Sequence, residues 1–360
     1  MVVLGDKMKK IRNTISNIGI LNEEAMKAAK KRQDFLTKPK ESLGILEDLS
    51  IKVAGITGNV LPKIRNKVII TMVGDHGVVE EGVSAYPQEV TSQMVYNFIG
   101  GGAGINVLAR HAGARLVLVD MGVATDLKPH PKLINKKIAY GTKNMARGPA
   151  MTYEQAIESI EAGIDIVKEQ LEKGIDIIGI GEMGIGNTTT ASAIIAAITS
   201  EPAERIVGRG TGIGDKTLRN KIEVIKKALE VNKPDLNDPI DVLAKVGGFE
   251  IGGLVGVILE SAANRIPIVL DGFEPGAAAL IATELEPKVK NFLIAPICSR
   301  EPGDKITLKK LGLVPFLNLK LNLGEGTGAV LGISIVEAGV KILTEMATFA
   351  EAGVAEAIKK

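Results

Sequence analysis

Short apolar runs rich in Val and Ile alternate with helical patterns from about Lys67 onward, and this alternation limits the fold more than any other feature. Each run has the length of a strand and ends near a Gly or Asp. Because the runs are almost wholly apolar, they are typical of strands covered on both faces of a parallel sheet. We therefore predict an α/β fold with a doubly wound, mostly parallel sheet. The predicted strands are VIITMV, ARLVLVDMGV, IDIIGIG, IPIVLDGF, NFLIAPI and PFLNLKLNLGEG.

The two ends of the chain carry helical patterns with no strand pattern between them. Helices are predicted over 23–36 and 42–56, the second with leucines at helical spacing on one face. Within the central region, the pattern predicts a helix over 92–111 and an exposed loop over 128–149. We expect a Rossmann-like large domain and a smaller helical domain built from both chain ends. The predicted boundaries are 1–62 and 328–360 for the small domain and 63–327 for the large one.

The composition argues against several classes of partner. The chain has 360 residues and a formal net charge of +2, so a basic nucleic-acid-binding face is not expected. Its one cysteine, Cys298, and three widely spaced histidines show no metal-ligand pattern, and we interpret the histidines as ordinary polar or packing residues. The most apolar stretch, 254–270, contains Glu260 and Arg265, and the N-terminus lacks a signal-peptide core. We expect a cytoplasmic protein with no metal site and no membrane contact.

One glycine pattern suggests a dinucleotide site. Residues 179–184, GIGEMG, fit the G-x-G-x-x-G pattern that holds a pyrophosphate at a helix start. However, Glu182 lies inside the pattern, where its carboxylate would repel a pyrophosphate. No second strand ends in an acid at the expected distance, and no group of residues suited to hydride transfer accompanies the pattern. An NAD-dependent oxidoreductase is therefore the weaker alternative.

Two further glycine-rich segments are suited to binding a single phosphate or carboxylate. The first, GIGNTTT, opens a predicted helix, and the second, VGRGTGIGDK, places a glycine at every second residue. Neither has the lysine of a nucleoside-triphosphate loop. The alternatives are a capped helix start, with Asn187 or Thr188 as the N-cap, and a flexible connector. The candidate anion-binding residues are Gly184, Gly186, Asn187, Thr188, Gly208, Gly210, Thr211 and Gly212.

Polar residues follow the last predicted strands of the sheet. Asp271 and Gly272 end one strand, Ser299 follows the next, and Glu325 stands between two glycines after PFLNLKLNL. Because the carboxyl ends of parallel strands share one edge, these residues are expected to meet in one composite site. Asp and Ser suit ribose or phosphate contacts. Glu325 is suited to act as a general base, although stabilising the following helix through its dipole is an equally plausible role.

Taken together, the motifs resemble one family, the nicotinate-nucleotide:dimethylbenzimidazole phosphoribosyltransferases. They occur in the family's order and cover nearly the whole chain. The matching motifs are TKPKESLGILE, GDHGVVEEGVSAYPQEVT, GEMGIGNTTTASAI, VGRGTGI, LDGF, SREPG and LNLGEGTGA.

This resemblance implies an enzyme that converts nicotinate mononucleotide and dimethylbenzimidazole into α-ribazole 5′-phosphate and nicotinate, for the lower ligand of cobalamin. It implies a homodimer that needs no cofactor or metal, with Glu325 as the catalytic base. It also implies that Glu182, Gly184, Lys221, Asp271 and Ser299 surround the ribose phosphate and nicotinate. By the same resemblance, the benzimidazole pocket is formed by Ser84, Tyr86, Gln88 and Met183.

The chemistry of such a transfer is consistent with these residues. Nicotinate leaves readily because departure neutralises its ring nitrogen, so the reaction needs a base for the benzimidazole N–H rather than an acid for the leaving group. Attack from the opposite face inverts the anomeric carbon, and Glu182 is placed to stabilise positive charge on the ribose. A non-catalytic nucleotide-binding protein on the same fold is a further alternative, against which the presence of Glu325 argues.

Overall fold

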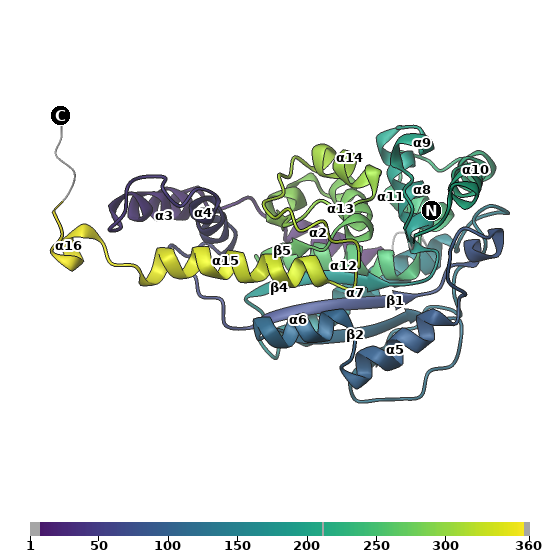
Figure 1. The fold of residues 1–360 in the computed structure, drawn as a ribbon, viewed down its shortest axis with the longest axis horizontal. Coiled ribbons are helices and arrows are strands. Elements are labelled where there is room, and N and C mark those ends of the chain that lie inside the picture. The colour runs from purple at the N-terminus through teal and green to yellow at the C-terminus, as the bar shows by residue number, and fades with distance from the viewer. Residues whose placement is uncertain (1–7, 211, 356–360) are drawn as a thin grey trace.

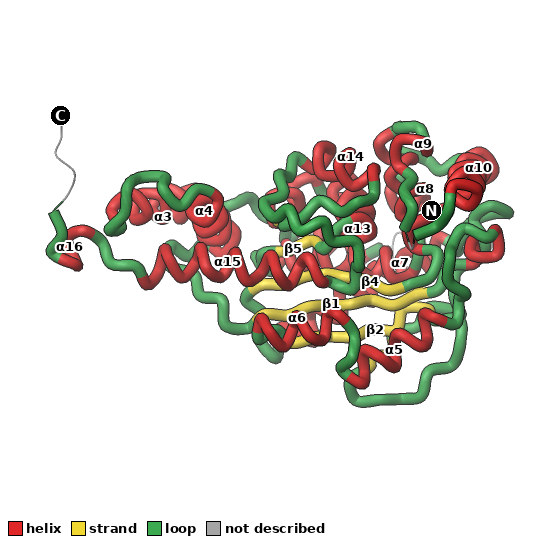
Figure 2. Tube along the Cα trace, viewed as in Figure 1, coloured by secondary structure: helices red, strands yellow, loops and turns green. Residues whose placement is uncertain are grey.

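A sheet of six parallel strands forms the centre of the protein (Figures 1 and 2). The computed structural model describes residues 8–210 and 212–355. The strand order is β3-β2-β1-β4-β5-β6, and helices cover both faces, which confirms the predicted doubly wound α/β fold. The strands are β1 (Lys67–Gly74), β2 (Arg115–Gly122), β3 (Leu133–Asn135), β4 (Ile177–Met183), β5 (Ile268–Leu270) and β6 (Leu293–Ile294).

The order of the strands reverses between β1 and β4. Strand β1 pairs with β2 on one side and with β4 on the other, so the sheet grows outward from this central pair. In open sheets of this kind, ligands bind outside the carboxyl ends of the strands at the point of reversal. The register places Met72 beside Glu182, so Glu182 lies near the carboxyl end of the central pair.

Alternate residues of β1 face two separate cores. Val68, Ile70 and Met72 belong to the larger core, and Ile69 and Val73 belong to the smaller one on the other face. This continuous burial explains why the strand has no polar face. The larger core contains α7 (Tyr153–Leu171), α12 (Phe249–Ala263) and α13 (Phe273–Leu285), and the smaller one α5 (Val90–Gly100), α6 (Gly104–Ala112) and α15 (Thr327–Glu345).

Helices from both chain ends pack together at one side of the sheet (Figure 1). Here α3 (Glu23–Phe35) and α4 (Ile45–Thr57) contact α15, with Ala29, Ala54 and Leu343 forming a small core. In contrast, α2 (Lys9–Ser16) packs on α7 and α12, where Thr14 Oγ1 donates a 2.8 Å hydrogen bond to Glu260. The predicted domain boundaries remain a prediction.

The other helices are η1 (Gly77–Glu81), α8 (Asn187–Thr199), α9 (Ala203–Ile206), α10 (Asp215–Asn232), α11 (Pro239–Val246), η2 (Pro287–Phe292), α14 (Pro302–Leu311) and α16 (Phe349–Ala352).

Helix α15 is, among the described residues, the one helix long and apolar enough to cross a membrane by length and composition. About half of its most apolar window, 56%, is buried inside the protein. It contacts β1, β4 and β5 near its start and α3 and α4 further along. These contacts show that α15 packs against the sheet and against the helices from the N-terminal part of the chain.

Two predicted elements, the helix over 92–111 and the loop over 128–149, differ from the structure. The helix expected over 92–111 is broken into α5 and α6, because Gly101 adopts a left-handed conformation with φ 81° and ends α5. The loop expected over 128–149 contains the short edge strand β3, and its residues Met145 and Ala146 are buried. The break between α5 and α6 exposes the first backbone N–H groups of α6 to the site.

The strand predicted from PFLNLKLNLGEG is wrong. Residues 312–326, which we call the strap, form no regular strand, and only Leu317 makes a single bridge, to Ile297. The alternating apolar residues have no partner strand, so Leu319 and Leu323 are half exposed rather than buried. The strap therefore runs along the mouth of the site as an extended loop and leads into α15.

Candidate active site

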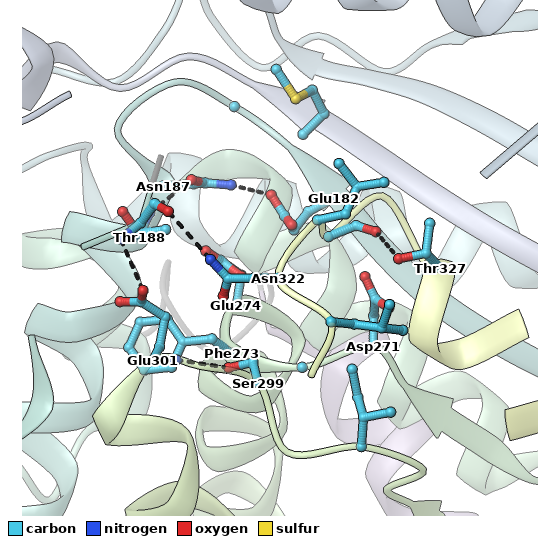
Figure 3. A pocket seen from close by; sticks show the side chains of 18 of the residues that line it. Glu182, Asn187, Thr188, Asp271, Phe273, Glu274, Ser299, Glu301, Asn322 and Thr327 are labelled. Carbon is cyan, nitrogen blue, oxygen red and sulfur yellow. Dashed lines mark hydrogen bonds between the residues drawn. The ribbon is translucent and has the colours of Figure 1, made fainter. Parts of the chain in front are cut away.

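A cavity of about 790 Å³, counting the space that opens to solvent, lies beyond the carboxyl ends of β4 and β5 (Figure 3). Its position at the point where the strand order reverses agrees with the predicted composite site. The start of α8, the start of α13, the segment before α14 and the strap contribute its walls. The lining residues are Glu182, Met183, Gly184, Ile185, Asn187, Thr188, Gly210, Asp271, Gly272, Phe273, Glu274, Ile297, Ser299, Glu301, Leu321, Asn322, Leu323, Gly324 and Thr327.

The G-x-G-x-x-G pattern does not form a dinucleotide loop. All but its last residue lie within β4. A side chain at Gly179 would collide with Ile69, and one at Gly181 would overlap the backbone of Gly326. These glycines therefore let α15 and the end of the strap pack directly on the strand. The structure gives them a packing role, which removes the main argument for the oxidoreductase alternative.

The turn after β4 lines the cavity with Gly184 and Ile185 and leads into the first turn of α8. Gly184 lies against the carbonyl of Gly74, where a side chain would overlap it. Gly186, with φ 97°, is the N-cap of α8, so neither Asn187 nor Thr188 is the N-cap. Asn187 and Thr188 line the cavity at the first turn of α8, while Gly186 lies behind it. Such a helix start attracts an anion.

Lys221 supports this turn from α10. Its side chain is fully buried, and its Nζ donates a 2.7 Å hydrogen bond to Thr188 Oγ1. Burial lowers the pKa of Lys221, while the carboxylates of Glu301 and Glu274 oppose that shift. Lys221 therefore stands just behind the lining rather than in it.

The second glycine-rich loop contributes Gly210 to the cavity. Gly208 lies behind it against Glu301, and Gly212 is exposed with φ 94°. Thr211 lies outside the described residues. The N–H of Gly210 donates a 2.8 Å hydrogen bond to Glu301 Oε1, so a carboxylate of the same chain occupies this loop.

Four carboxyl groups lie close together on the β5 side of the cavity, and we call them the acidic floor. Burial raises the pKa of Glu182 well above its usual range, and Glu274 and Asp271 add to the shift. Burial likewise raises the pKa of Asp271 to about 7 and that of Glu274 to about 8. Asp271 also accepts hydrogen bonds from the backbone N–H groups of Gly326 (2.8 Å) and Gly328 (2.5 Å). The floor consists of Glu182, Asp271, Glu274 and Glu301.

Glu325 lies directly behind the lining residues Leu323 and Gly324. It adopts a left-handed conformation with φ 64° and is buried, with 4% of its surface exposed. Its Oε2 accepts a 3.0 Å hydrogen bond from the N–H of Ile105 at the start of α6. Burial raises the pKa of Glu325, while the backbone N–H groups of Ile105 and Gly104 lower it. Its carbonyl accepts a 2.8 Å hydrogen bond from Thr71 Oγ1, which fixes the turn.

The residues predicted to form the benzimidazole pocket fall into two groups, one that lines the cavity and one that does not. Met183 lines the cavity, whereas Ser84, Tyr86 and Gln88 belong to the loop between η1 and α5 and are not among the lining residues. Tyr86 is 53% exposed. This loop is nevertheless tied to the cavity, because Thr91 Oγ1 accepts a 3.1 Å hydrogen bond from the N–H of Ile185.

Sequence reasoning missed several residues that the structure brings to the site. Glu274 and Glu301 follow strand ends in the motifs LDGFEPG and SREPG, where a charged residue beside an apolar strand was the available signal. Asn322 and Leu323 were missed because the strap was expected to be a strand. Ser299 and Gly272, both predicted, do line the cavity.

His76 is also more than an ordinary packing residue. Its Nε2 lies 2.9 Å from Glu250 Oε1, with both side chains fully buried, and its Nδ1 is 3.1 Å from Thr190 Oγ1 on α8. Burial alone would lower the pKa of His76, but Glu250 and Asp75 raise it above its usual value. Over residues 8–210 and 212–355, no group of three or more His, Cys, Asp or Glu side chains is arranged to hold a metal ion.

Comparison with known proteins assigns the chain to a family. A family model described as "Phosphoribosyltransferase" matches residues 18–354. The nicotinate-nucleotide–dimethylbenzimidazole phosphoribosyltransferase of Desulforudis audaxviator is 56% identical over 97% of this chain and 99% of its own length. The protein of that name from Chloroflexus aurantiacus is 55% identical over 98% of this chain and all of its own length.

A solved structure agrees with these sequence matches. The crystal structure of CobT from Thermus thermophilus superposes with a TM-score of 0.90 at 45% identity, covering 93% of this chain and all of that one. The structural similarity therefore extends over most of the chain. The chain belongs to the nicotinate-nucleotide:dimethylbenzimidazole phosphoribosyltransferase family.

Proposed function

We propose that this protein transfers ribose 5-phosphate from nicotinate mononucleotide to 5,6-dimethylbenzimidazole, giving α-ribazole 5′-phosphate and nicotinate. The observation that carries the proposal is that the α8 turn, the acidic floor and the Gly324–Glu325 turn meet around one cavity. Relatives named for this reaction match the chain over nearly their whole length.

The 5′-phosphate is assigned to the space between the first turn of α8 and Gly210. The positive end of the α8 dipole attracts a phosphate, and the Thr188 N–H, which donates a 2.7 Å hydrogen bond to the side-chain oxygen of Asn187, could turn to the phosphate instead. Lys221 supplies positive charge behind this position through Thr188. The proposal predicts that a structure with bound nicotinate mononucleotide has its phosphate within about 6 Å of both loops, close enough for direct or water-mediated hydrogen bonds.

The ribose is assigned to the region beside Glu182 and Asp271. As nicotinate departs, positive charge develops on the ribose, and a carboxylate held beside it stabilises that charge. Glu182 is fixed for such a role, because Asn187 donates a hydrogen bond to its carboxylate and Gly324 packs against it. The departing pyridinium nitrogen becomes neutral, so nicotinate leaves without a general acid. The proposal assigns no metal or cofactor.

Glu325 is assigned as the general base. A benzimidazole lying between Met183 and Leu323 would bring its N–H toward the turn that carries Glu325. Proton transfer to the carboxylate as the other ring nitrogen attacks the ribose would leave a neutral product base. Because the acceptor attacks from the face opposite nicotinate, the anomeric carbon inverts from β to α.

We further propose that the enzyme is a cytoplasmic homodimer that contacts neither nucleic acid nor membranes. The family resemblance and the near-neutral formal charge of +2 support this assignment. Light scattering on the purified chain tests the oligomeric state, with twice the mass of 38.0 kDa expected.

The activity is tested by incubating the protein with nicotinate mononucleotide and dimethylbenzimidazole, followed by chromatography and NMR of the anomeric proton. Formation of the α-anomer with release of nicotinate is the expected result. Binding of nicotinate mononucleotide without turnover would favour the non-catalytic alternative. Tight binding of NAD with no transfer product would favour the oxidoreductase.

A further inference from the structure

The carboxyl group of Glu301 occupies the loop that Gly208 and Gly210 form. Its side chain is buried, with 5% of the residue exposed, and its Oε1 accepts the 2.8 Å hydrogen bond from the N–H of Gly210 (Figure 3). A side chain at Gly208 would overlap the same carboxyl group and would displace it from the loop. The loop is therefore shaped around an anion that the chain itself supplies.

Few protein groups compensate the charge of this carboxyl group. Its Oε2 is buried and has no hydrogen-bond partner, and no ion pair of Glu301 is found within the described part of the chain. Lys221, a cation close enough for the charge of Glu301 to affect its pKa, donates its hydrogen bond to Thr188 instead. Glu274 and Asp304 lie close enough to feel its charge. A buried oxygen without a donor is costly, so this arrangement calls for an explanation.

The position of Glu301 coincides with the position proposed for the substrate phosphate. A phosphate oxygen that accepts the Gly210 N–H needs the same donor that Glu301 uses, and two anions at one donor repel each other strongly in a buried site. Substrate binding at this loop therefore has to move the carboxyl group away.

We infer that Glu301 is a resident anion that holds the Gly208–Gly210 loop in its phosphate-binding shape and is displaced by the 5′-phosphate of the donor. This inference rests on the proposed function. Moving the Glu301 carboxyl group out of the loop costs free energy, which lowers the affinity for any ligand that bears a phosphate. Its return to the loop speeds release of the phosphorylated product. Glu301 thus determines specificity at the phosphate end of the site and takes no part in bond making.

The test compares two ligands that differ only in the phosphate, nicotinate mononucleotide and nicotinate riboside, by calorimetry on the full chain. Glu301→Gln keeps the size and one acceptor but removes the charge. It should bind the mononucleotide at least about tenfold more tightly than the wild-type protein does. Its affinity for the riboside should be unchanged. Product release, followed by rapid mixing, should become slower.

Equal or weaker binding of the mononucleotide by a folded Glu301→Gln protein would overturn the inference, as would a parallel change for the riboside. If this variant does not fold, Glu301→Asp keeps the charge at the start of α14 but is too short to reach Gly210. It should also bind the mononucleotide more tightly, and weaker binding would overturn the inference. Failure of wild-type protein to bind either ligand or turn over would instead contradict the proposed function.

Discussion

The acidic floor and the strap both hold carboxyl groups at the site, but the groups around these carboxyls differ. In the floor, burial and neighbouring acids act together, so the pKa of Glu182 is well above its usual range and that of Glu274 is about 8. In the strap, burial raises the pKa of Glu325, but the N–H groups of Gly104 and Ile105 oppose that shift. Glu182 and Glu274 therefore hold a proton more readily than Glu325 does, until positive charge develops on the ribose and favours the ionised form of Glu182. This difference supports our proposal that Glu325 rather than Glu182 is the base.

The largest expected effect comes from Glu325→Gln. This change keeps the size and an acceptor for the Ile105 N–H but removes the base, so turnover should fall about 10²–10⁴-fold. Benzimidazole attacks slowly without help, so some activity should remain. Affinity for nicotinate mononucleotide, measured by calorimetry, should change little. The control is Glu345→Gln, an exposed position at the far end of α15. A large loss of nucleotide affinity with normal turnover would make Glu325 a binding residue.

A smaller effect is expected from Glu182→Gln. The amide keeps the contact with Asn187 but cannot stabilise positive charge on the ribose, so kcat should fall about 10–100-fold, less than the loss of a fully aligned electrostatic group. Steady-state kinetics at saturating dimethylbenzimidazole measure this loss. A decrease larger than that of Glu325→Gln would reverse the assignment of the two carboxylates.

The choice of acceptor base should change by about tenfold with Met183→Ala. Pocket methylenes discriminate between substrates by about 1–3 kcal/mol, so the ratio of kcat/KM for dimethylbenzimidazole and unsubstituted benzimidazole should shift. Gln88→Ala should shift the same ratio less, since Gln88 is not among the residues that line the cavity. Affinity for nicotinate mononucleotide serves as the internal control. An unchanged base preference in both variants would remove these residues from the pocket.

The smallest expected effect concerns stability. The pKa of Glu274 is about 8 in the folded protein and its usual value is 4.5, so the folded state holds a proton that the unfolded chain has lost between these pH values. Its contribution to the free energy of unfolding therefore decreases as pH rises through this window. Glu274→Gln should be more stable than wild type by about 1 kcal/mol near pH 8 and should show less pH dependence.

Urea unfolding of the ligand-free protein at pH 5 and pH 8 measures this difference. Glu158→Gln, an exposed position on α7, is the control. A Glu274→Gln variant that is less stable than wild type at pH 8 would show that Glu274 is not held protonated.

The part of the site formed by strands and helices could be predicted from the sequence, because parallel strands buried on both faces have continuous apolar sequences. Once β1, β4 and β5 were recognised, the shared edge brought Glu182, Asp271 and the α8 turn together by topology alone. The loop conformation of the strap could not be predicted, because alternating apolar residues such as Leu319 and Leu323 predict a strand whether or not a partner strand exists.

The same limit applies to the roles of single carboxylates. The sequence places Glu301 after a strand end but cannot show that its carboxyl group turns back to accept the Gly210 N–H. Likewise, the break at Gly101 that directs the start of α6 toward Glu325 depends on one left-handed residue inside a helical pattern. Contacts between residues distant in the sequence, such as Ile105 and Glu325, affect the pKa values of these carboxyl groups, and local patterns carry no information about such contacts.

The most direct test of the central claim is the pH dependence of kcat/KM for dimethylbenzimidazole in the wild type, Glu325→Gln and Glu182→Gln. A base acts only when deprotonated, so the rate of the wild type should fall as pH decreases through the pKa of Glu325, which burial raises. Protonation of the substrate is common to all three proteins and cancels in the comparison. We predict that this fall is lost in Glu325→Gln and kept in Glu182→Gln. Loss of the acidic limb in Glu182→Gln with its retention in Glu325→Gln would contradict the account.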